Sequence, residues 1–363
     1  MINLLATGKR AARIVLAFIL ALLLTLLIIL LLRIPHDDWR QMPLPNLQQQ
    51  PLRLRVVYAS NPRFAEISAQ QLQDMLAITR TQIKHDFDLD VDFEIQKPIE
   101  ITELFSHLPA AVKAQRRIAI ANPQTIDDAT RMQMRNTLLQ QLQSSTSGQK
   151  NLMNFSRPHL LNPASVTDLT SLAQALVDTQ INRLQYWYDS TARDGKPVID
   201  GSQYNQWVWW DSLGYGELPY DIVITNQLVA SLETYDVAIH SALRGGITGG
   251  TMTYSKHGRY GGYVFVSVFA LINDYPLLTE LRADTHYSVQ QDTQYAAATL
   301  THELGHLFFH YDHPFGVGVC VMSPTPLLHY RAWYDGLDAA ACRALQLPQM
   351  QPGAADLNYN AQW

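Results

Sequence analysis

The sequence predicts an α/β (α+β) fold with a mixed, twisted sheet, preceded by one membrane-spanning helix. Three observations lead to this prediction. An uncharged apolar run covers residues 14–32, a strand, a helix and a second strand follow it, and a glycine-rich pair of strands precedes a long helix near the C terminus. Of the 363 residues 47% are hydrophobic, so the part beyond the apolar run is large enough for one sizeable core.

The apolar run fits a retained membrane helix, which we assign to residues 14–33. Nineteen apolar residues extend about 28 Å, close to the roughly 30 Å hydrocarbon core of a bilayer. No small-residue cleavage site follows, but a cleaved signal peptide stays as the alternative. Basic residues are concentrated before the run, so residues 1–13 are expected in the cytoplasm and the rest in the periplasm or outside the cell. These residues are Lys9, Arg10 and Arg13.

Residues 34–53 are rich in proline and glutamine, which indicates a linker between the membrane and a domain of residues 54–348. Residues 349–363 have little pattern and form a C-terminal tail. The alternation of apolar residues and a serine cap predict the first elements of the domain. These are a strand at 54–59, a helix at 68–87, a strand at 91–95 and a further strand at 117–121.

The middle of the chain is mostly helical in pattern from about residue 123 to 188, and it indicates an insertion of about residues 123–215. Breaks are expected near 144–148 and at Pro158 and Pro163. Four tryptophans lie in or near a loop of this region, and they indicate either a core layer or a surface for substrate or membrane. The core interpretation is favoured because aromatic side chains contribute large buried area. They are Trp187, Trp207, Trp209 and Trp210.

A short apolar strand at 221–226 precedes two segments that predict an antiparallel pair. The segments are 244–254, which contains four glycines, and 261–271, and the turn between them covers 256–260. No phosphate-binding loop of the GxxxxGK[ST] or GxGxxG type occurs in a strand-to-helix setting.

The sequence Thr301-His302-Glu303-Leu304-Gly305-His306 carries the chemistry of this chain. On a helix, residues four apart lie on one face, so His302 and His306 can bind one zinc ion, and Glu303 is placed to reach a water on it rather than to ligate it. Asp292 is expected to cap this helix. The alternative is a buried helix with incidental polar residues, but paired histidines beside a glutamate seldom go inside without partners.

The residues around this helix resemble the metzincin zinc peptidases, whose motif is HExxHxxGxxH followed by a methionine turn. Counted from His302, the third ligand falls on Asp312, and the turn matches Cys320-Val321-Met322-Ser323-Pro324. The likeness is to archaemetzincins and adamalysins, which share a Cys-x-Met turn, and to snapalysin, whose third ligand is an aspartate. Phe309 stands where the family has glycine, and this departs from the pattern.

That departure leaves the third ligand open. Asp312 is favoured on register, and two imidazoles with one carboxylate form an accepted catalytic zinc shell. His313 is the alternative, because the loss of the glycine turn could shift the loop by one residue. His310 would lie about 12 Å along the helix from His302, too far for one tetrahedral ion.

The resemblance implies a membrane-anchored zinc metallopeptidase that hydrolyses peptide bonds. It implies one Zn²⁺ ion, Glu303 as general base, Met322 below the metal and a small C-terminal subdomain. It also implies that the antiparallel edge strand, with Gly249, Gly250 and Thr251, holds an extended peptide by main-chain hydrogen bonds. The alternative is a glycine-rich hairpin with no binding role.

Cys320 and Cys342 are the only cysteines, which agrees with export. A disulfide between them would pin the turn region to a helix expected at 336–347, and two unpaired buried thiols are the alternative. The formal net charge of −5, with no basic block outside the membrane flank, disfavours a nucleic-acid partner. Two other functions stay open: a zinc amidase that acts on a cell-wall component, and a non-catalytic membrane-anchored zinc-binding or assembly protein.

Overall fold

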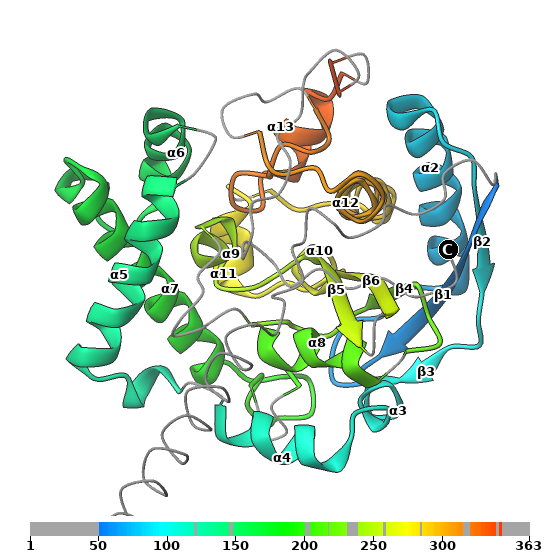
Figure 1. The fold of residues 1–363 in the computed structure, drawn as a ribbon, viewed down its shortest axis with the longest axis horizontal. Coiled ribbons are helices and arrows are strands. Elements are labelled where there is room, and N and C mark those ends of the chain that lie inside the picture. Colours follow the sequence, from blue (N-terminus) through cyan, green and yellow to red (C-terminus); the bar gives the residue numbers. More distant parts are fainter. Residues whose placement is uncertain are drawn as a thin grey trace, which may run out of the picture. The chain divides into compact units, whose positions relative to one another are not determined.

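A mixed sheet with the strand order β2-β1-β4-β6-β5 lies at the centre of the computed structural model of this protein, and β3 pairs with β1 beside this path (Figure 1). The structure describes residues 51–342 apart from 120–121, 145–147, 200–203, 217, 231–238, 257–258, 284, 315–319 and 339–340. The strands are β1 Leu52–Ser60, β2 Val91–Ile95, β3 Ile99–Glu100, β4 Ile222–Thr225, β5 Gly249–Lys256 and β6 Arg259–Ser267.

The pairing of these strands is parallel except at one edge. In the parallel part, Val57 is opposite Val223, which is opposite Phe265. At the edge, β5 runs antiparallel to β6 and places Thr251 opposite Val264. The predicted α/β class, the strands at 54–59, 91–95 and 221–226, and the antiparallel pair are therefore confirmed. Because β1 begins at Leu52, the linker predicted to end at residue 53 is too long by two residues.

Twelve α-helices are assigned in the described part of the chain. They are α2 Ala69–Phe87, α3 Ile101–Ser106, α4 Ala110–Ala119, α5 Asp128–Ser144, α6 Gln149–Ser156, α7 Leu169–Asp189, α8 Trp207–Leu213, α9 Ile239–Arg244, α10 Phe269–Ile272, α11 Pro276–Leu281, α12 Val289–Phe309 and α13 Tyr330–Asp335. The strand predicted at 117–121 is wrong, because its first residues belong to α4. That segment follows a run of alanine, lysine, glutamine and arginine, which are strong helix formers.

Helix α12 packs against α2 and against β5 and β6 of the sheet (Figure 1). The hydroxyl of Thr79 on α2 donates to the carbonyl of Ala297 at 3.3 Å, and that of Thr301 donates to the Gln82 side chain at 2.9 Å. Nearly all of α12 from Tyr295 to Phe308 is buried. The helix with the histidines is thus an interior element, fixed by a neighbouring helix and by the sheet.

Ser288, not Asp292, caps the N terminus of α12. Its hydroxyl accepts from the backbone N–H of Gln291, whose side chain accepts from the Ser288 N–H. This is a reciprocal capping box, which a serine three residues before glutamine forms readily. The predicted cap at Asp292 is wrong, and that residue is instead buried in the first turn. The predicted serine cap of the helix at 68–87 is confirmed at Ser68.

The buried position of Asp292 predicts a pH-dependent stability. Burial raises the pKa of this carboxyl from 3.8 to about 7. The folded state therefore holds the proton more tightly than the unfolded state, and stability is lost as the pH rises from about 4 to 7. Asp292→Asn removes the free-energy cost of ionising a buried carboxyl group. We expect urea unfolding to show a gain on the order of 2 kcal/mol at pH 8 and little gain at pH 4. Asp92→Asn, at an exposed carboxylate, is the control, and an equal gain at both pH values would contradict the assignment.

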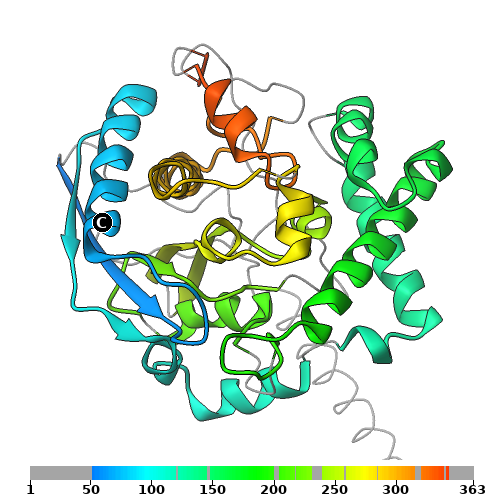
Figure 2. The same cartoon turned by 180° about the vertical axis from the view of Figure 1, so that it is seen from behind.

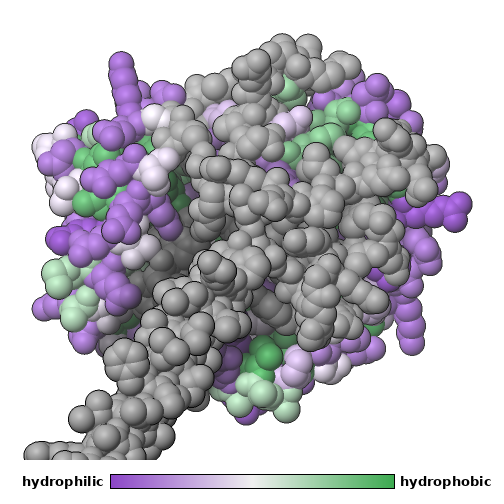
Figure 3. Space-filling view, in the orientation of Figure 1, coloured by the Kyte–Doolittle hydropathy of each residue, from purple (hydrophilic) through white to green (hydrophobic). Residues whose placement is uncertain are grey.

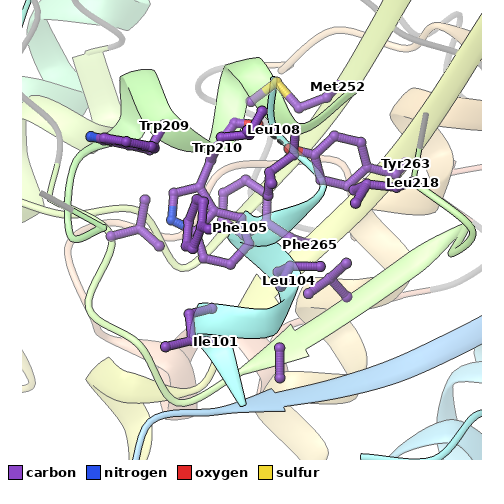
Figure 4. Packing of buried hydrophobic residues seen from close by; sticks show 14 of the residues in the cluster. Ile101, Leu104, Phe105, Leu108, Trp209, Trp210, Leu218, Met252, Tyr263 and Phe265 are labelled. Atoms are coloured by element: carbon purple, nitrogen blue, oxygen red, sulfur yellow. Dashed lines mark hydrogen bonds between the residues drawn. The ribbon is translucent and has the colours of Figure 1, made fainter. Parts of the chain in front are cut away.

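The other face of the sheet holds an aromatic core under α3 and α8 (Figure 4). Phe105 lies edge-on to Trp209 and to Trp210, with ring centroids 5.7 and 5.6 Å apart, and Trp210 stacks on Phe265 at 4.6 Å. Trp187, on α7, is also fully buried. The core interpretation is confirmed for Trp187, Trp209 and Trp210, and Trp207 packs against this core but is only partly buried.

Helices α5, α6 and α7 lie together beside the sheet, and the two views show the same grouping (Figures 1 and 2). The helical pattern predicted for 123–188 is confirmed, with α5 ending at Ser144 and short turns at Pro158 and Pro163. Of the helix expected at 336–347, residues 341–342 are helical, while residues 339–340 and 343–347 lie outside the described part; α13 ends before this range, at Asp335.

The predicted membrane helix at 14–33, the residues before it, most of the linker and the tail at 349–363 lie outside the described residues. Within the described part, no helix has the length and apolar character that crossing a bilayer requires. The described surface visible in Figure 3 is mainly hydrophilic, with small apolar patches between charged and polar groups.

Candidate metal centre

Three histidines converge at the C-terminal end of α12. The Nε2 atom of His302 lies 3.0 Å from that of His306 and 3.0 Å from that of His313. The Nε2 atoms of His306 and His313 are 3.1 Å apart. The predicted pairing of His302 and His306 on one helical face is confirmed, and a third imidazole completes a nearly equilateral triangle.

The opposite ring nitrogens fix the tautomers of two of these histidines. Nδ1 of His302 lies 2.7 Å from the carbonyl oxygen of Val321, and Nδ1 of His306 contacts the carbonyl oxygen of Tyr311. A carbonyl can only accept, so each Nδ1 carries the hydrogen and donates it. The Nε2 atoms of these neutral rings therefore turn their lone pairs toward one point. Lone pairs that close together repel one another, and a cation between them removes the repulsion.

The geometry and the donor set fit a zinc ion. Zn–N bonds of about 2.0–2.1 Å place the nitrogens of a tetrahedral site about 3.3 Å apart, close to the observed separations. Burial lowers the pKa of His302 and His313 well below 6.5 and that of His306 to about 4, so all three rings stay neutral and free to ligate near pH 7. Three imidazoles with a fourth position for water or substrate form a catalytic type of zinc site.

The way α12 ends determines which candidate for the third ligand meets the two helical histidines. The helix stops at Phe309, and His310 takes a left-handed conformation with φ 54° and ψ 30°. The chain then turns back, so that Tyr311 presents its carbonyl to His306 and His313 presents its ring to both helical histidines. The preference for Asp312 is therefore corrected to the alternative, His313. The physical reason is that the left-handed residue lies one position later than the glycine of the metzincin pattern, which moves the ligand by one position as well.

Asp312 lies beside the triad rather than in it. Its Oδ1 accepts from the backbone N–H of His313 at 2.7 Å and lies 3.9 Å from Nδ1 of the His313 ring. A carboxylate there holds the start of the turn and faces the outer nitrogen of a ligand, which is a common way to orient a metal-binding histidine.

Glu303 is buried beside the triad and is held by β5. Thr251 donates its hydroxyl to the Glu303 backbone carbonyl at 2.8 Å and lies 3.0 Å from Oε2 of the same residue. Burial raises the pKa of Glu303 to about 8, against the opposing effects of the Thr251 hydrogen bond and the Arg244 charge. A dication bound next to this carboxyl would favour its ionised form. Glu303, the predicted base, directly follows His302 in the sequence, and Thr251 of β5 orients its side chain.

The edge strand contributes to the site in a way that the sequence did not indicate. A Cβ on Gly249 would come within 2.6 Å of Oε1 of Glu303, and one on Gly250 would meet the rings of Phe265 and Trp207 at 2.7–2.9 Å. The two glycines are therefore required by internal packing on opposite faces of the sheet. β5 is the last strand in the order of the sheet. Its predicted role in holding a peptide stays a prediction.

The methionine-turn region packs directly under α12. Gly305 has no side chain, and Met322 fills that space with its sulfur while its neighbour Val321 accepts from His302. The predicted disulfide is confirmed between Cys320 and Cys342, with Cα atoms 4.8 Å apart. This bridge fixes the segment whose Val321 carbonyl holds the His302 ring, and the predicted place of Met322 below a metal stays a prediction.

Sequence reasoning did not identify two further residues of this region, which lie on the short helix α9. The ring of His240 meets that of His313 with centroids 4.6 Å apart, and Arg244 is buried near Glu303. They precede His302 by about sixty residues in a segment without a recognisable motif. The only signal for them in the sequence is their spacing of four residues, which places both side chains on one face of a helix.

The chain was compared with protein-family models, with curated proteins and with solved structures, and none of them matches.

Proposed function

We propose that this protein is a zinc-dependent metallopeptidase, anchored in a membrane by its N-terminal segment and with its catalytic domain on the outside. The observation that carries the proposal is the triad of the buried His302 and His306 with the half-buried His313, together with the buried Glu303 that follows His302. A metal site that is only structural has four protein ligands and no need of a base. Three ligands and a buried glutamate are what hydrolysis requires.

The residues of the site have separate roles in this proposal. The three imidazoles hold the ion, which when bound polarises a carbonyl and acidifies water. Glu303 accepts the proton of the attacking water and passes it to the leaving amine, and Thr251 keeps its carboxylate in place. The buried surroundings strengthen each of these electrostatic effects, because the local dielectric constant is low.

Two features of the fold support a peptide as substrate. The site lies beside an antiparallel edge strand, and such an edge can bind an extended chain by main-chain hydrogen bonds. The segment Cys320-Val321-Met322, which carries part of the resemblance to metzincins, packs against Gly305 of α12 and is held by the disulfide to Cys342. The ligand spacing is one residue longer than the metzincin motif, and the position of the left-handed residue accounts for the difference.

The proposal predicts that the purified protein contains one zinc ion and loses its activity without it. We expect elemental analysis to give close to one zinc per chain, and a mixed library of quenched fluorescent peptides to be cleaved. Dialysis against a chelator should remove both the zinc and the activity, and added Zn²⁺ should restore them. A protein with full zinc content that cleaves no peptide, but releases amines from cell-wall fragments, would favour the amidase. Full zinc content without any hydrolysis would favour the binding role.

A further inference from the structure

A small cavity that Arg244 of α9 lines is otherwise walled mostly by apolar side chains. It has a volume of about 20 Å³, which is room for about one water molecule or one group of similar size. Its walls come from α7, α9, α10, α11, the residues directly before β5 and the region of Leu328. They include Trp187, Leu228, Leu278, Leu328, Thr248 and Arg244.

Arg244 brings a positive charge to this apolar cavity. Its side chain is only 8% exposed. Nη1 donates to the Thr248 hydroxyl at 2.7 Å, and Nη2 lies 3.5 Å from the carbonyl oxygen of Thr325. Nε has no acceptor, and no carboxylate lies within ion-pair distance of the guanidinium, among the residues that the structure describes. A buried charge that has only neutral partners is costly, so a site of this kind favours an anion.

The position of Arg244 connects the cavity to the catalytic residues. Thr248, which accepts from Arg244, also accepts from the Tyr330 hydroxyl at 2.7 Å and directly precedes Gly249. Gly249 is the residue whose missing side chain makes room for Glu303. On the other side, Arg244 shares α9 with His240, whose ring contacts that of His313. The cavity is thus adjacent to the base and to the third ligand.

We propose that this cavity is a substrate subsite that binds a carboxylate close to the scissile bond, through the free N–H of Arg244. The inference rests on the proposed peptidase function and names its substrate class: peptides with an acidic group next to the bond that is cut. The guanidinium supplies a charge-assisted hydrogen bond, and the apolar walls contact the carbon atoms of the same residue. The small volume admits only the carboxylate end of a residue, so aspartate or a C-terminal carboxylate is favoured over a longer side chain.

Binding of small probes to the zinc-loaded Glu303→Gln protein tests the subsite without any catalysis. We choose N-acetyl-aspartate amide, which has only a side-chain carboxylate, N-acetyl-alanine, which has only a terminal one, and N-acetyl-asparagine amide, which has neither. Calorimetric titration should show that one of the two acids binds about 10-fold to 100-fold more tightly than the neutral probe. The acid that binds identifies the source of the carboxylate. Equal binding of all three probes would overturn the proposal.

Two arginine variants separate the subsite from a general effect of charge. Arg244→Met should abolish the preference for the acid, and Arg244→Lys, which keeps the charge, should retain part of it. Arg183→Met is the matched control, because Arg183 is also buried and also has an N–H without an acceptor among the described residues, but it does not line the cavity. A preference that survives in Arg244→Met, or that is lost equally in Arg183→Met, contradicts the assignment. Thermal unfolding shows whether each variant is folded.

Peptide cleavage by the wild type gives a test that needs no variant. Peptides with aspartate on either side of the scissile bond should be cut with a kcat/KM at least about 10-fold above that of their asparagine counterparts. If no peptide is cleaved while the acid probe still binds through Arg244, the peptidase proposal fails and the anion subsite stands. If peptides are cleaved without preference for aspartate or a free C terminus, the peptidase proposal stands and the subsite fails.

Discussion

Replacement of Glu303 by glutamine is expected to lower kcat for peptide cleavage by about 10²-fold to 10⁴-fold, the usual contribution of a general base. The zinc content should stay at the wild-type level, because the side chain of Glu303 is not one of the three ligands that converge. Glutamine is nearly isosteric and can still accept from Thr251, whose hydroxyl lies 3.0 Å from the carboxylate. The loss would therefore report on proton transfer, and the fold should be unaffected.

The measurement is kcat together with zinc content and thermal stability for the wild type, Glu303→Gln and Glu94→Gln. Glu94 is an exposed glutamate on β2, so its replacement controls for the loss of a negative charge. Activity of Glu303→Gln within a few-fold of the wild type would show that another group takes the proton. Loss of zinc in that variant would show that the glutamate is a ligand.

His313→Ala is expected to weaken zinc binding by about 10²-fold to 10³-fold. Structural zinc sites with four ligands have apparent binding free energies of about 10–16 kcal/mol, so one ligand corresponds to about 3–4 kcal/mol. Asp312→Asn should lower the zinc affinity only about tenfold, because Asp312 supports the turn and faces the outer side of the His313 ring. Competition with a chromogenic chelator measures both affinities.

The zinc affinities of these two variants distinguish between Asp312, which the motif favours as third ligand, and His313, whose ring meets the other two histidines. A larger loss for Asp312→Asn than for His313→Ala would restore Asp312 as the third ligand. His310→Ala is a useful control, because His310 ends α12 in a left-handed conformation and its ring is not part of the triad. We expect it to change stability and to leave the ratio of the two zinc affinities unchanged.

Much of the fold could be predicted because the relevant signals are local. The serine cap of α2, the alternation in β1, the short apolar run of β4 and the glycine-rich antiparallel pair β5 and β6 each depend on a few neighbouring residues. The strand predicted at 117–121 is wrong because the strong helix formers before this short apolar segment extend the helix into it. The cap predicted at Asp292 is wrong because Ser288, four residues earlier, forms a capping box with Gln291.

The sequence by itself determined the pairing of His302 and His306 and the place of Glu303 between them, because a spacing of four residues fixes one face of any helix. It also determined that the two cysteines could bridge. Only the tertiary structure decided that His313, and not Asp312, meets the two helical histidines, since the turn at His310 sets the direction of the chain after the helix. It also placed Thr251, His240 and Arg244 near Glu303 or His313. These residues come from separate segments, and the packing of the sheet against α12, rather than any local spacing, brings them together.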